Sequence, residues 1–219
     1  MTQIKEIFTS IQGEGPFVGY KQLFIRFCGC NLNCAYCDTD FNSDGAVIYT
    51  PEELAEVCNK HSDCHSVSLT GGEPLLNVEF LKSFLPLCDL PLYLETNGTL
   101  YDELGEIVEY LDYISMDIKL PSCTKLSPQW DKHEKFLNIA KDKNTCVKVV
   151  FDENITEFEI EKIVHVCSKY GVEIVLQPKM NGNIPSVSSE FMSEITNKFT
   201  KLYNKTRLIP QVHKFIGFI

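Results

Sequence analysis

Cysteine is the residue whose spacing is most unusual in this chain. Three of the ten cysteines, Cys30, Cys34 and Cys37, follow the pattern Cys-x3-Cys-x2-Cys within the segment CGCNLNCAYCDTD, residues 28–40. Thiolates so close together on one short segment can hold a metal ion or a metal cluster. Unrelated core cysteines are a poor explanation for such a density. The segment therefore predicts a metal centre.

Zinc, a disulfide and an iron–sulfur cluster are the alternatives for this segment. A structural zinc site needs four ligands, usually as two separated pairs. Cys28 could be a fourth ligand, but no second Cys-x2-Cys pair follows it in the chain. Three protein ligands on a 4Fe-4S cluster would leave one iron open for a substrate or cofactor. The spacing favours this last centre, and zinc remains the alternative.

Length and charge limit the class of protein. The 219 residues suit one domain, residues 1–219. The first residues, MTQIKEIFTS, lack an apolar signal core, and no apolar run approaches the roughly 20 residues of a membrane helix. We therefore expect a cytoplasmic protein with no membrane partner, in which disulfides are rare. The formal net charge of -10 argues against a nucleic-acid partner.

Six short runs rich in β-branched and aromatic residues predict strands, at 21–27, 66–70, 91–96, 113–119, 145–151 and 172–177. Helical spacing predicts helices at 51–60, 78–88, 101–111, 129–142, 156–170 and 189–203. This alternation predicts an α/β fold whose sheet is parallel, with right-handed crossovers. Six units are too few for a closed eight-stranded barrel, so an open partial barrel or a doubly wound sheet remains. The segments before and after should flank this core.

Polar residues follow these strands at their carboxyl ends, where parallel α/β folds gather their chemistry. The first strand ends near Arg26 and leads into the cysteine segment. The other clusters are TGGEP at 70–74, ETNG at 95–98, DIK at 117–119 and QP at 177–178. Because these ends share one edge of the sheet, we expect an active site there.

Two of these motifs together resemble the radical S-adenosylmethionine superfamily. The cysteine pattern follows the first strand with an aromatic residue, Tyr36, before the last cysteine, and TGGEP follows the second strand. The resemblance implies a partial (β/α)6 TIM-like barrel and a 4Fe-4S cluster whose open iron binds S-adenosylmethionine. Reductive cleavage of that cofactor gives a 5′-deoxyadenosyl radical. Gly71 and Gly72 suit a close approach of backbone to ligand, because they lack Cβ.

Further segments resemble one family within it, the 7-carboxy-7-deazaguanine synthases. They are SIQGEGP at 10–16, FIRF at 24–27, CDT at 37–39, ETNGT at 95–99 and PQVH at 210–213. The resemblance implies ring contraction of 6-carboxy-5,6,7,8-tetrahydropterin to 7-carboxy-7-deazaguanine, with loss of ammonia, for queuosine or related 7-deazapurines. It also implies Mg2+, regeneration of S-adenosylmethionine, a flavodoxin or ferredoxin reductant, and a homodimer. The nearest alternative is an activase of a glycyl-radical enzyme, although those usually carry Asp-Gly-Pro-Gly instead of Gln-Gly-Glu-Gly.

The family resemblance assigns the substrate to Ile11, Gln12, Gly13, Glu14, Arg26, Thr70, Glu95, His213 and Ile219. Gln12 and Glu14 suit the amide and amino edge of a pterin, since a carboxylate can accept from two N–H groups. Arg26 suits the substrate carboxylate through its fork of donors, and a plain salt bridge is the alternative. Glu95 could instead be a core-edge carboxylate bonded to Asn97. The QGEG segment could also be a simple hairpin turn.

The same resemblance assigns the cofactors. S-Adenosylmethionine would contact Tyr36, Asp38, Gly72, Asp117, Ile118, Lys119 and Gln177, and the cluster would be held by Cys30, Cys34 and Cys37. Thr39 would bind Mg2+, because a hydroxyl oxygen suits a hard ion. The family more often has Ser-Pro-Lys where this chain has DIK at 117–119, a departure at the first two positions.

The remaining cysteines and histidines carry no motif. Buried free thiols are predicted for Cys58, Cys64, Cys88, Cys123, Cys146 and Cys167. Solvent exposure is predicted for His61, His65, His133 and His165. A zinc-binding or iron–sulfur electron-carrier module would not need TGGEP, ETNG and His213 at strand ends, so the sequence favours an enzyme.

Overall fold

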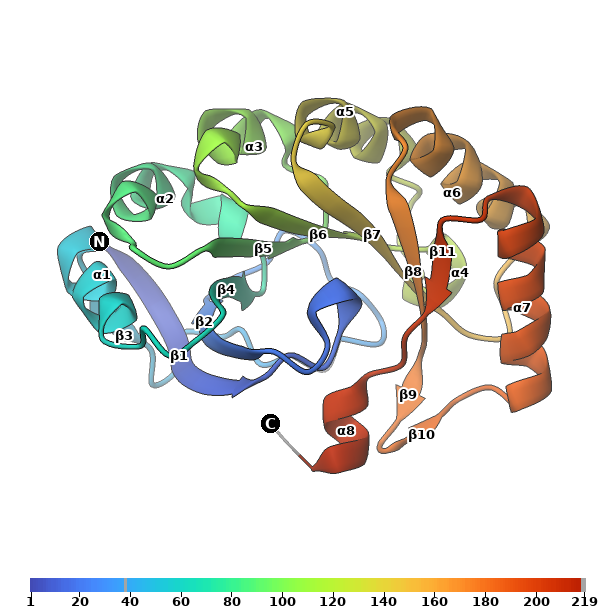
Figure 1. Cartoon of the computed structure of the whole chain (residues 1–219), viewed down its shortest axis with the longest axis horizontal. Coiled ribbons are helices and arrows are strands. Elements are labelled where there is room, and N and C mark those ends of the chain that lie inside the picture. The colour runs from blue at the N-terminus through green and yellow to red at the C-terminus, as the bar shows by residue number, and fades with distance from the viewer. Residues whose placement is uncertain (38, 218–219) are drawn as a thin grey trace.

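A curved, mostly parallel sheet forms the frame of the chain, whose computed structural model describes residues 1–37 and 39–217. Over these residues the sheet has nine strands in the order β11-β8-β7-β6-β5-β4-β2-β1-β3. Its central parallel strands are β2 (Lys21–Phe27), β4 (Ser66–Gly71), β5 (Leu92–Thr96), β6 (Tyr113–Ile118), β7 (Asn144–Phe151) and β8 (Glu173–Pro178). Figure 1 shows the sheet bent into an open barrel with the longer helices on its convex side. The predicted strands and partial barrel are confirmed.

The helices on the convex side follow the predicted ranges closely. They are α1 (Pro51–Asn59), α2 (Val78–Phe84), α3 (Tyr101–Ile107), α5 (Trp130–Ala140), α6 (Glu157–Tyr170) and α7 (Ser189–Leu202). α1 and α6 each begin with a capping box, in which Thr50 pairs with Glu53 and Thr156 with Glu159. Among the described helices, none is both long and apolar enough to cross a membrane.

The two ends of the chain extend the sheet, as predicted for flanking segments. β1 (Thr2–Ile11) pairs antiparallel with β2, and β3 (Val47–Tyr49) pairs antiparallel with β1. At the opposite edge, β11 (Thr206–Leu208) pairs parallel with β8. The short elements not predicted are β3, β11, α4 (Pro121–Thr124), α8 (Val212–Ile216), β9 (Met180–Asn181) and β10 (Ile184–Pro185). Segments this short carry too little periodicity to be recognised in a sequence.

Alternation along the central strands separates an apolar face from a polar one. On β6, Met116 packs in the apolar core under the helices, whereas Ser115 and Asp117 face the barrel interior. On β7, Val147 belongs to the same core and Lys148 faces the interior. Successive side chains point to opposite faces of a strand, so the sheet that buries the core also directs polar groups inward.

An aromatic cluster closes the end of the barrel where the parallel strands begin. The 3-10 turn η1 (Gly15–Phe17) places Phe17 with its ring centroid 5.6 Å from that of Tyr93 and 4.5 Å from that of Tyr113. Gly15 has φ of 65°, and a Cβ there would lie 3.1 Å from the Tyr93 hydroxyl, so glycine suits this turn. The carboxyl ends of the strands remain open for ligands.

His133 is buried, and the prediction that it is exposed was wrong. The residue, on α5, is 1% exposed, and its Nε2 lies 3.1 Å from the carbonyl oxygen of Asn97. Burial lowers the pKa of His133 to about 4, so the imidazole is neutral at physiological pH. No motif surrounds His133, so nothing in the sequence indicated that its side chain contacts Asn97 in the ETNG segment. His165 is exposed as predicted, while His61 and His65 are half-buried.

Candidate active site

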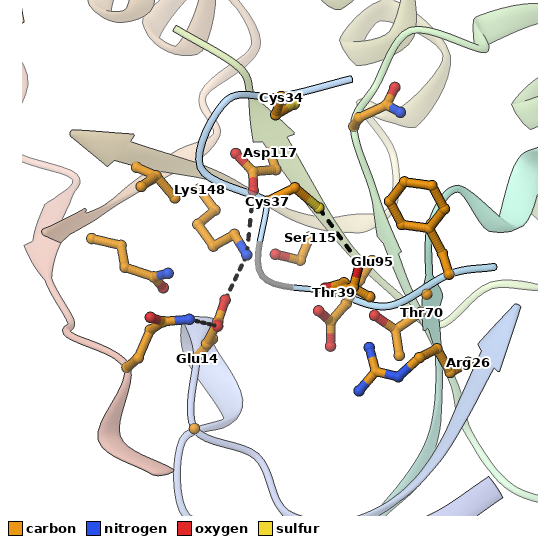
Figure 2. Close-up of a pocket in the computed structure, with 18 of the residues that line it drawn as sticks. Glu14, Arg26, Cys34, Cys37, Thr39, Thr70, Glu95, Ser115, Asp117 and Lys148 are labelled. Carbon is orange, nitrogen blue, oxygen red and sulfur yellow. Dashed lines mark hydrogen bonds and ion pairs between the residues drawn. The ribbon is translucent and has the colours of Figure 1, made fainter. Parts of the chain in front are cut away.

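A cavity of about 810 Å³ opens at the carboxyl ends of the strands and holds most of the predicted site residues. Those lining it are Ile11, Gln12, Gly13, Glu14, Arg26, Cys30, Cys34, Tyr36, Cys37, Thr39, Thr70, Gly72, Glu95, Asp117, Lys119, Gln177 and His213. Figure 2 shows the cysteine segment above Glu14 and Arg26, which lie on opposite sides of the cavity. Ile118 is not brought there, because its side chain is fully buried in the helix-facing core. The assignments of Asp38 and Ile219 lie outside the described residues.

Three of the four clustered cysteines face this cavity. Cys30, Cys34 and Cys37 line it, whereas the Sγ of Cys28 lies 3.5 Å from the carbonyl oxygen of Asn42, in the outer part of the loop. Burial raises the pKa of Cys30, and it raises the pKa of Cys34 to about 11. Both thiols are therefore protonated at neutral pH unless a metal takes the thiolate.

The three cysteines suit an iron–sulfur cluster better than a single zinc ion. Among the described residues, the group whose ligand atoms all lie within 4.8 Å of one another is His61, Asp63 and Cys64, and the loop cysteines do not form such a group. Zinc–sulfur bonds of about 2.3 Å would draw three sulfurs closer than that limit. Ligands of a cubane cluster bind separate irons and can be spread more widely. The donor set therefore fits a 4Fe-4S cluster with three protein ligands.

Two glycines let the TGGEP segment pack directly under the cysteine segment. A Cβ on Gly72 would lie 1.8 Å from the carbonyl oxygen of Gly29, and one on Gly71 would lie 2.4 Å from the carbonyl oxygen of Phe27. Gly71 also has φ of 129°, which L side chains rarely adopt. The pair therefore sets the distance between this backbone and the cysteines.

Glu73 joins the TGGEP and ETNG segments beneath the cavity. Its fully buried carboxylate accepts hydrogen bonds from the Thr96 hydroxyl at 2.8 Å and from the amide nitrogens of Asn97 and Leu75 at 2.8 and 3.1 Å. Burial nevertheless outweighs these bonds and raises the pKa of Glu73 to about 7. The Asn97 side chain donates in turn to Asn31 in the cysteine segment at 2.8 Å. These contacts fix three strand-end segments relative to one another.

The side of the cavity beside the cysteines carries paired charges and two unsatisfied oxygens. Lys119 Nζ lies 2.7 Å from Asp117 Oδ2 and 5.4 Å from the ring centroid of Tyr36. Burial opposes ionisation of Asp117, but the charges of Lys119 and Lys148 outweigh it and lower the pKa. Asp117 Oδ1 and Gln177 Oε1 are buried without a hydrogen-bond partner among the described residues. Such acceptors fit a polar ligand with N–H or O–H donors.

Glu14 extends across the opening of the partial barrel. Its Oε2 lies 2.5 Å from Lys148 Nζ on β7, and its Oε1 accepts a hydrogen bond from Gln211 Nε2 at 2.7 Å. Burial would raise its pKa, but Lys148 and Gln211 outweigh burial and lower the pKa to about 2. The backbone adds a bond between the amide of Val212 and the carbonyl of Gly13, at 2.9 Å. The QGEG segment is thus more than a hairpin turn, because it joins β1 to the far edge of the barrel.

Gln12 and Glu95 form a polar network in the wall of the cavity. Gln12 Nε2 donates to Glu95 Oε1 at 3.0 Å and to Gln22 Oε1 at 2.9 Å. Glu95 also accepts from the Ser68 hydroxyl at 2.8 Å. Its partners are therefore Gln12 and Ser68, and the alternative bond to Asn97 was wrong. The network orders one wall of the cavity before any ligand binds.

Arg26 and Thr39 both line the cavity, and Figure 2 draws them on the side away from Glu14 and Lys148. Arg26 Nε pairs with Glu6 Oε2 at 3.1 Å, and its guanidinium carbon lies 5.7 Å from the centroid of the Phe8 ring. The predicted alternative, a salt bridge, is thus present, but it uses Nε while the guanidinium fork points into the cavity. The pair with Glu6 holds the fork in an orientation that suits an anion bound in the cavity.

His213 packs against the QGEG segment from the C-terminal side. A Cβ on Gly13 would lie 2.0 Å from His213 Nδ1, so the imidazole occupies the space that a larger residue would fill. His213 reaches this position on α8, whose first turn is bonded to Gly13. The fold therefore brings together the QGEG segment and the C-terminal segment, which the sequence assigned to the same site.

Sequence reasoning missed Lys148, Gln211 and Ser115, which also line the cavity. A signal existed for Lys148, because it interrupts the apolar run of β7, and strands of a parallel sheet are usually near-continuous in apolar residues. Gln211 stood beside His213 in a segment already assigned to the site. Ser115 is a small polar residue in a buried strand, which by itself indicates little.

Comparison with known proteins agrees with this geometry. The family model described as the Radical SAM superfamily matches residues 24–167. The 7-carboxy-7-deazaguanine synthase of Geobacter sulfurreducens is 34% identical over 98% of this chain and 97% of its own length. That of Archaeoglobus fulgidus is 34% identical over 97% of this chain and 96% of its own length.

Solved structures support the fold. The crystal structure of QueE from Escherichia coli superposes with a TM-score of 0.64 at 22% identity, covering 97% of this chain and 94% of the other. Methylornithine synthase gives a TM-score of 0.56 at 16% identity, covering 85% of this chain and 63% of the other. By its cysteine spacing, its partial barrel and its near full-length relatives, the chain belongs to the 7-carboxy-7-deazaguanine synthase family of the radical S-adenosylmethionine superfamily.

Proposed function

We propose that the chain converts 6-carboxy-5,6,7,8-tetrahydropterin to 7-carboxy-7-deazaguanine, with loss of ammonia. One observation carries this proposal: a single cavity joins the three thiols of the cysteine segment to Glu14 on one side and Arg26 on the other. An acceptor for an N–H edge and a fork of donors for a carboxylate match the two polar ends of a carboxypterin. The relatives from Geobacter sulfurreducens and Archaeoglobus fulgidus are named for this activity, and this chain matches them over almost their whole length.

The cysteine side of the cavity would hold the cofactors. Cys30, Cys34 and Cys37 would provide the thiolates, and Gly72, which lacks a Cβ, lets the backbone after β4 pack closely against the cysteine segment. A 4Fe-4S cluster with S-adenosylmethionine supplies the radical chemistry when bound. Lys119 offers a positive charge to the carboxylate of the cofactor, and the unpartnered Oε1 of Gln177 offers an acceptor to its amino or hydroxyl groups.

The two sides of the cavity below the cysteine segment would orient the pterin. Glu14 is held ionised, so it can accept from the amino and ring N–H groups, with Gln12 beside it. Arg26 would grip the carboxylate across the cavity, and Thr70 and His213 would contact the ring from β4 and α8. A flat ring held at both ends has one orientation, which places the same atoms toward the cysteine side in every turnover.

Thr39 would provide a ligand for Mg2+ beside the substrate carboxylate. Thr39 and Arg26 line the same cavity, which supports that role. One hydroxyl leaves most positions around the ion to water and to substrate oxygens, which is common for Mg2+ in proteins. Substrate affinity should therefore increase with Mg2+ concentration.

Two partners follow from the family and stay predictions. A small flavodoxin or ferredoxin would deliver the electron, and a second copy of the chain would form a homodimer. Reduction of the reconstituted protein by each carrier tests the electron donor. Sedimentation velocity tests the homodimer.

The experiment is an anaerobic reaction of the reconstituted protein with S-adenosylmethionine, dithionite, Mg2+ and 6-carboxytetrahydropterin, followed by mass analysis. Formation of 7-carboxy-7-deazaguanine by the wild type, and its loss in Cys34→Ala, is the expected result. Formation of 5′-deoxyadenosine without the deazapurine would overturn the substrate assignment and favour an activase. Absence of both products, with zinc bound in place of iron, would overturn the enzyme itself.

A further inference from the structure

Lys148 connects the substrate side of the cavity with the cofactor side. Its Nζ lies 2.5 Å from Glu14 Oε2 and 3.3 Å from Asp117 Oδ2, and its side chain is 13% exposed. Its neighbours on β7, Val147 and Val149, are fully buried in the core, so the strand is held rigidly. Figure 2 shows the ammonium group between the two carboxylates.

The contact with Lys148 keeps the carboxyl group of Glu14 ionised. Lys148 contacts one carboxylate oxygen and Gln211 donates to the other, at 2.7 Å. Burial alone would raise the pKa of Glu14, and the charge of Lys148 is the largest of the influences that reverse this. An ionised carboxylate has no proton to give, so it can only accept hydrogen bonds.

We propose that Lys148, acting through Glu14, determines specificity for heterocycles that present adjacent N–H donors. The inference rests on the proposed function, in which Glu14 faces the ring of a pterin. A pterin offers an amino group beside a ring N–H, whereas a lumazine has a carbonyl oxygen in place of that amino group. The oxygen would face an anionic acceptor, so the lumazine loses a hydrogen bond and meets repulsion.

Removing the charge of Lys148 should relax this selection. Without it, Glu14 is a buried carboxylate, with Asp117 remaining on the opposite side of the vacated space. Burial and the like charge both favour a protonated carboxyl group. A protonated Glu14 can donate to a carbonyl oxygen, so the lumazine becomes an acceptable ligand. Lys148 is therefore a positioning residue and need not touch the substrate.

The test compares two inert aromatic ligands, 6-carboxypterin and 6-carboxylumazine, bound anaerobically to the reconstituted protein with S-adenosylmethionine and Mg2+. Calorimetric titration gives the ratio of their dissociation constants. We expect the wild type to favour the pterin by about 100-fold or more, and Lys148→Met to reduce that ratio at least about tenfold. Lys148→Arg, which keeps the charge, should restore most of it. Lys143→Met, a lysine change just before β7 and outside the cavity, is the matched control and should keep the wild-type ratio.

A double-mutant comparison tests whether Lys148 acts through Glu14. Glu14→Gln should lower the ratio by itself, and adding Lys148→Met to it should change the ratio by less than about twofold. A further large fall in the double variant would overturn the inference, since Lys148 would then select the ligand independently. If Lys148→Met does not fold, Lys148→Gln carries the same expectation, because it keeps polar contacts without the charge.

The outcomes separate this inference from the proposed function. A wild type that makes 7-carboxy-7-deazaguanine, together with a Lys148→Met protein that keeps the wild-type ratio, would overturn the inference alone. A wild type that neither makes the product nor binds 6-carboxypterin would overturn the proposed function and this inference with it.

Discussion

Arg26 shows how a single side chain is prepared for a ligand. Its Nε is engaged by Glu6, so the fork is oriented without being consumed. Arg26→Lys replaces two parallel donors by a point charge on a flexible stem. We expect carboxypterin affinity to fall about tenfold or more, while S-adenosylmethionine affinity changes less than about twofold. Calorimetric titration of each ligand measures both values, and equal losses would contradict the assignment of Arg26 to the substrate.

His133 makes stability depend on pH in a known direction. Its pKa is lowered by burial from 6.5 to about 4, so the unfolded chain binds the proton more tightly than the folded one. The stabilisation is complete above pH 6.5 and is lost as pH falls toward 4. The full effect is about 3 kcal/mol. Urea unfolding should therefore show a stability loss between pH 7 and 4 that is smaller in His133→Gln.

Comparing the wild type with His133→Gln also removes an opposing effect of Glu73 on the free energy of unfolding. Burial raises the pKa of Glu73 to about 7, so ionisation of Glu73 reduces stability as pH rises from its unfolded value toward neutrality. Because both proteins contain Glu73, the difference between their pH profiles isolates His133. Parallel profiles would show that His133 is not held neutral.

Among individual residues, the sequence predicted a place in the site for those that belong to motifs. The spacing of the cysteines, the QGEG segment and Arg26 at a strand end were all recognisable, and all reach the cavity. Lys148 and His133 were not recognised, because their importance depends on partners 134 and 36 positions away in the chain. A buried ion pair or a buried imidazole is defined by tertiary contacts, which no local pattern contains.

Among the elements, the loop after β4 gives the clearest test of close packing. Gly72→Ala would place a Cβ 1.8 Å from the Gly29 carbonyl oxygen, so the backbone near the cysteines must move. We expect a loss of about 2 kcal/mol or more in the free energy of unfolding, with reduced iron binding. Gly105→Ala on α3 is the matched control, because nothing lies within 4 Å of its Cβ. That change should stabilise by about 0.5–1 kcal/mol; similar losses in both variants would contradict the packing argument.

The cysteine segment should be separable from the barrel. Its thiols line the cavity and do not belong to the apolar core. Cys34→Ala should therefore abolish cluster binding, measured as iron and sulfide content, while the circular dichroism spectrum and melting temperature of the apo-protein stay close to wild type. An apo-variant that fails to fold would show that the segment is part of the folding core.

Element prediction succeeded for the six parallel strands, which are runs rich in β-branched and aromatic residues, and for the long helices. It missed β1 (Thr2–Ile11), a ten-residue strand that was predicted only as a flanking segment. β3, β9, β10 and β11 have two or three residues each, and their strand geometry comes from the neighbour they pair with. α8 has five residues and is fixed by its contact with Gly13.

For the whole molecule, the partial barrel explains why the cavity exists. Strand–helix alternation predicted the parallel sheet, and the polar strand ends predicted the position of the site. The closure of the opening could not be predicted, because it joins Glu14 to Lys148 and Gln211 across 134 and 197 positions. An open barrel closed by an ion pair leaves a large interior, in which cofactor and substrate can lie side by side.

The central claim is that three cysteines hold a cluster with one iron open toward this cavity. The electron paramagnetic resonance spectrum of the dithionite-reduced, reconstituted protein tests it, recorded before and after addition of S-adenosylmethionine. The account predicts a reduced 4Fe-4S signal that changes shape when the cofactor binds the open iron, and no such signal in Cys34→Ala. A wild-type signal that S-adenosylmethionine leaves unchanged, or a protein that binds zinc and gives no signal, would contradict it.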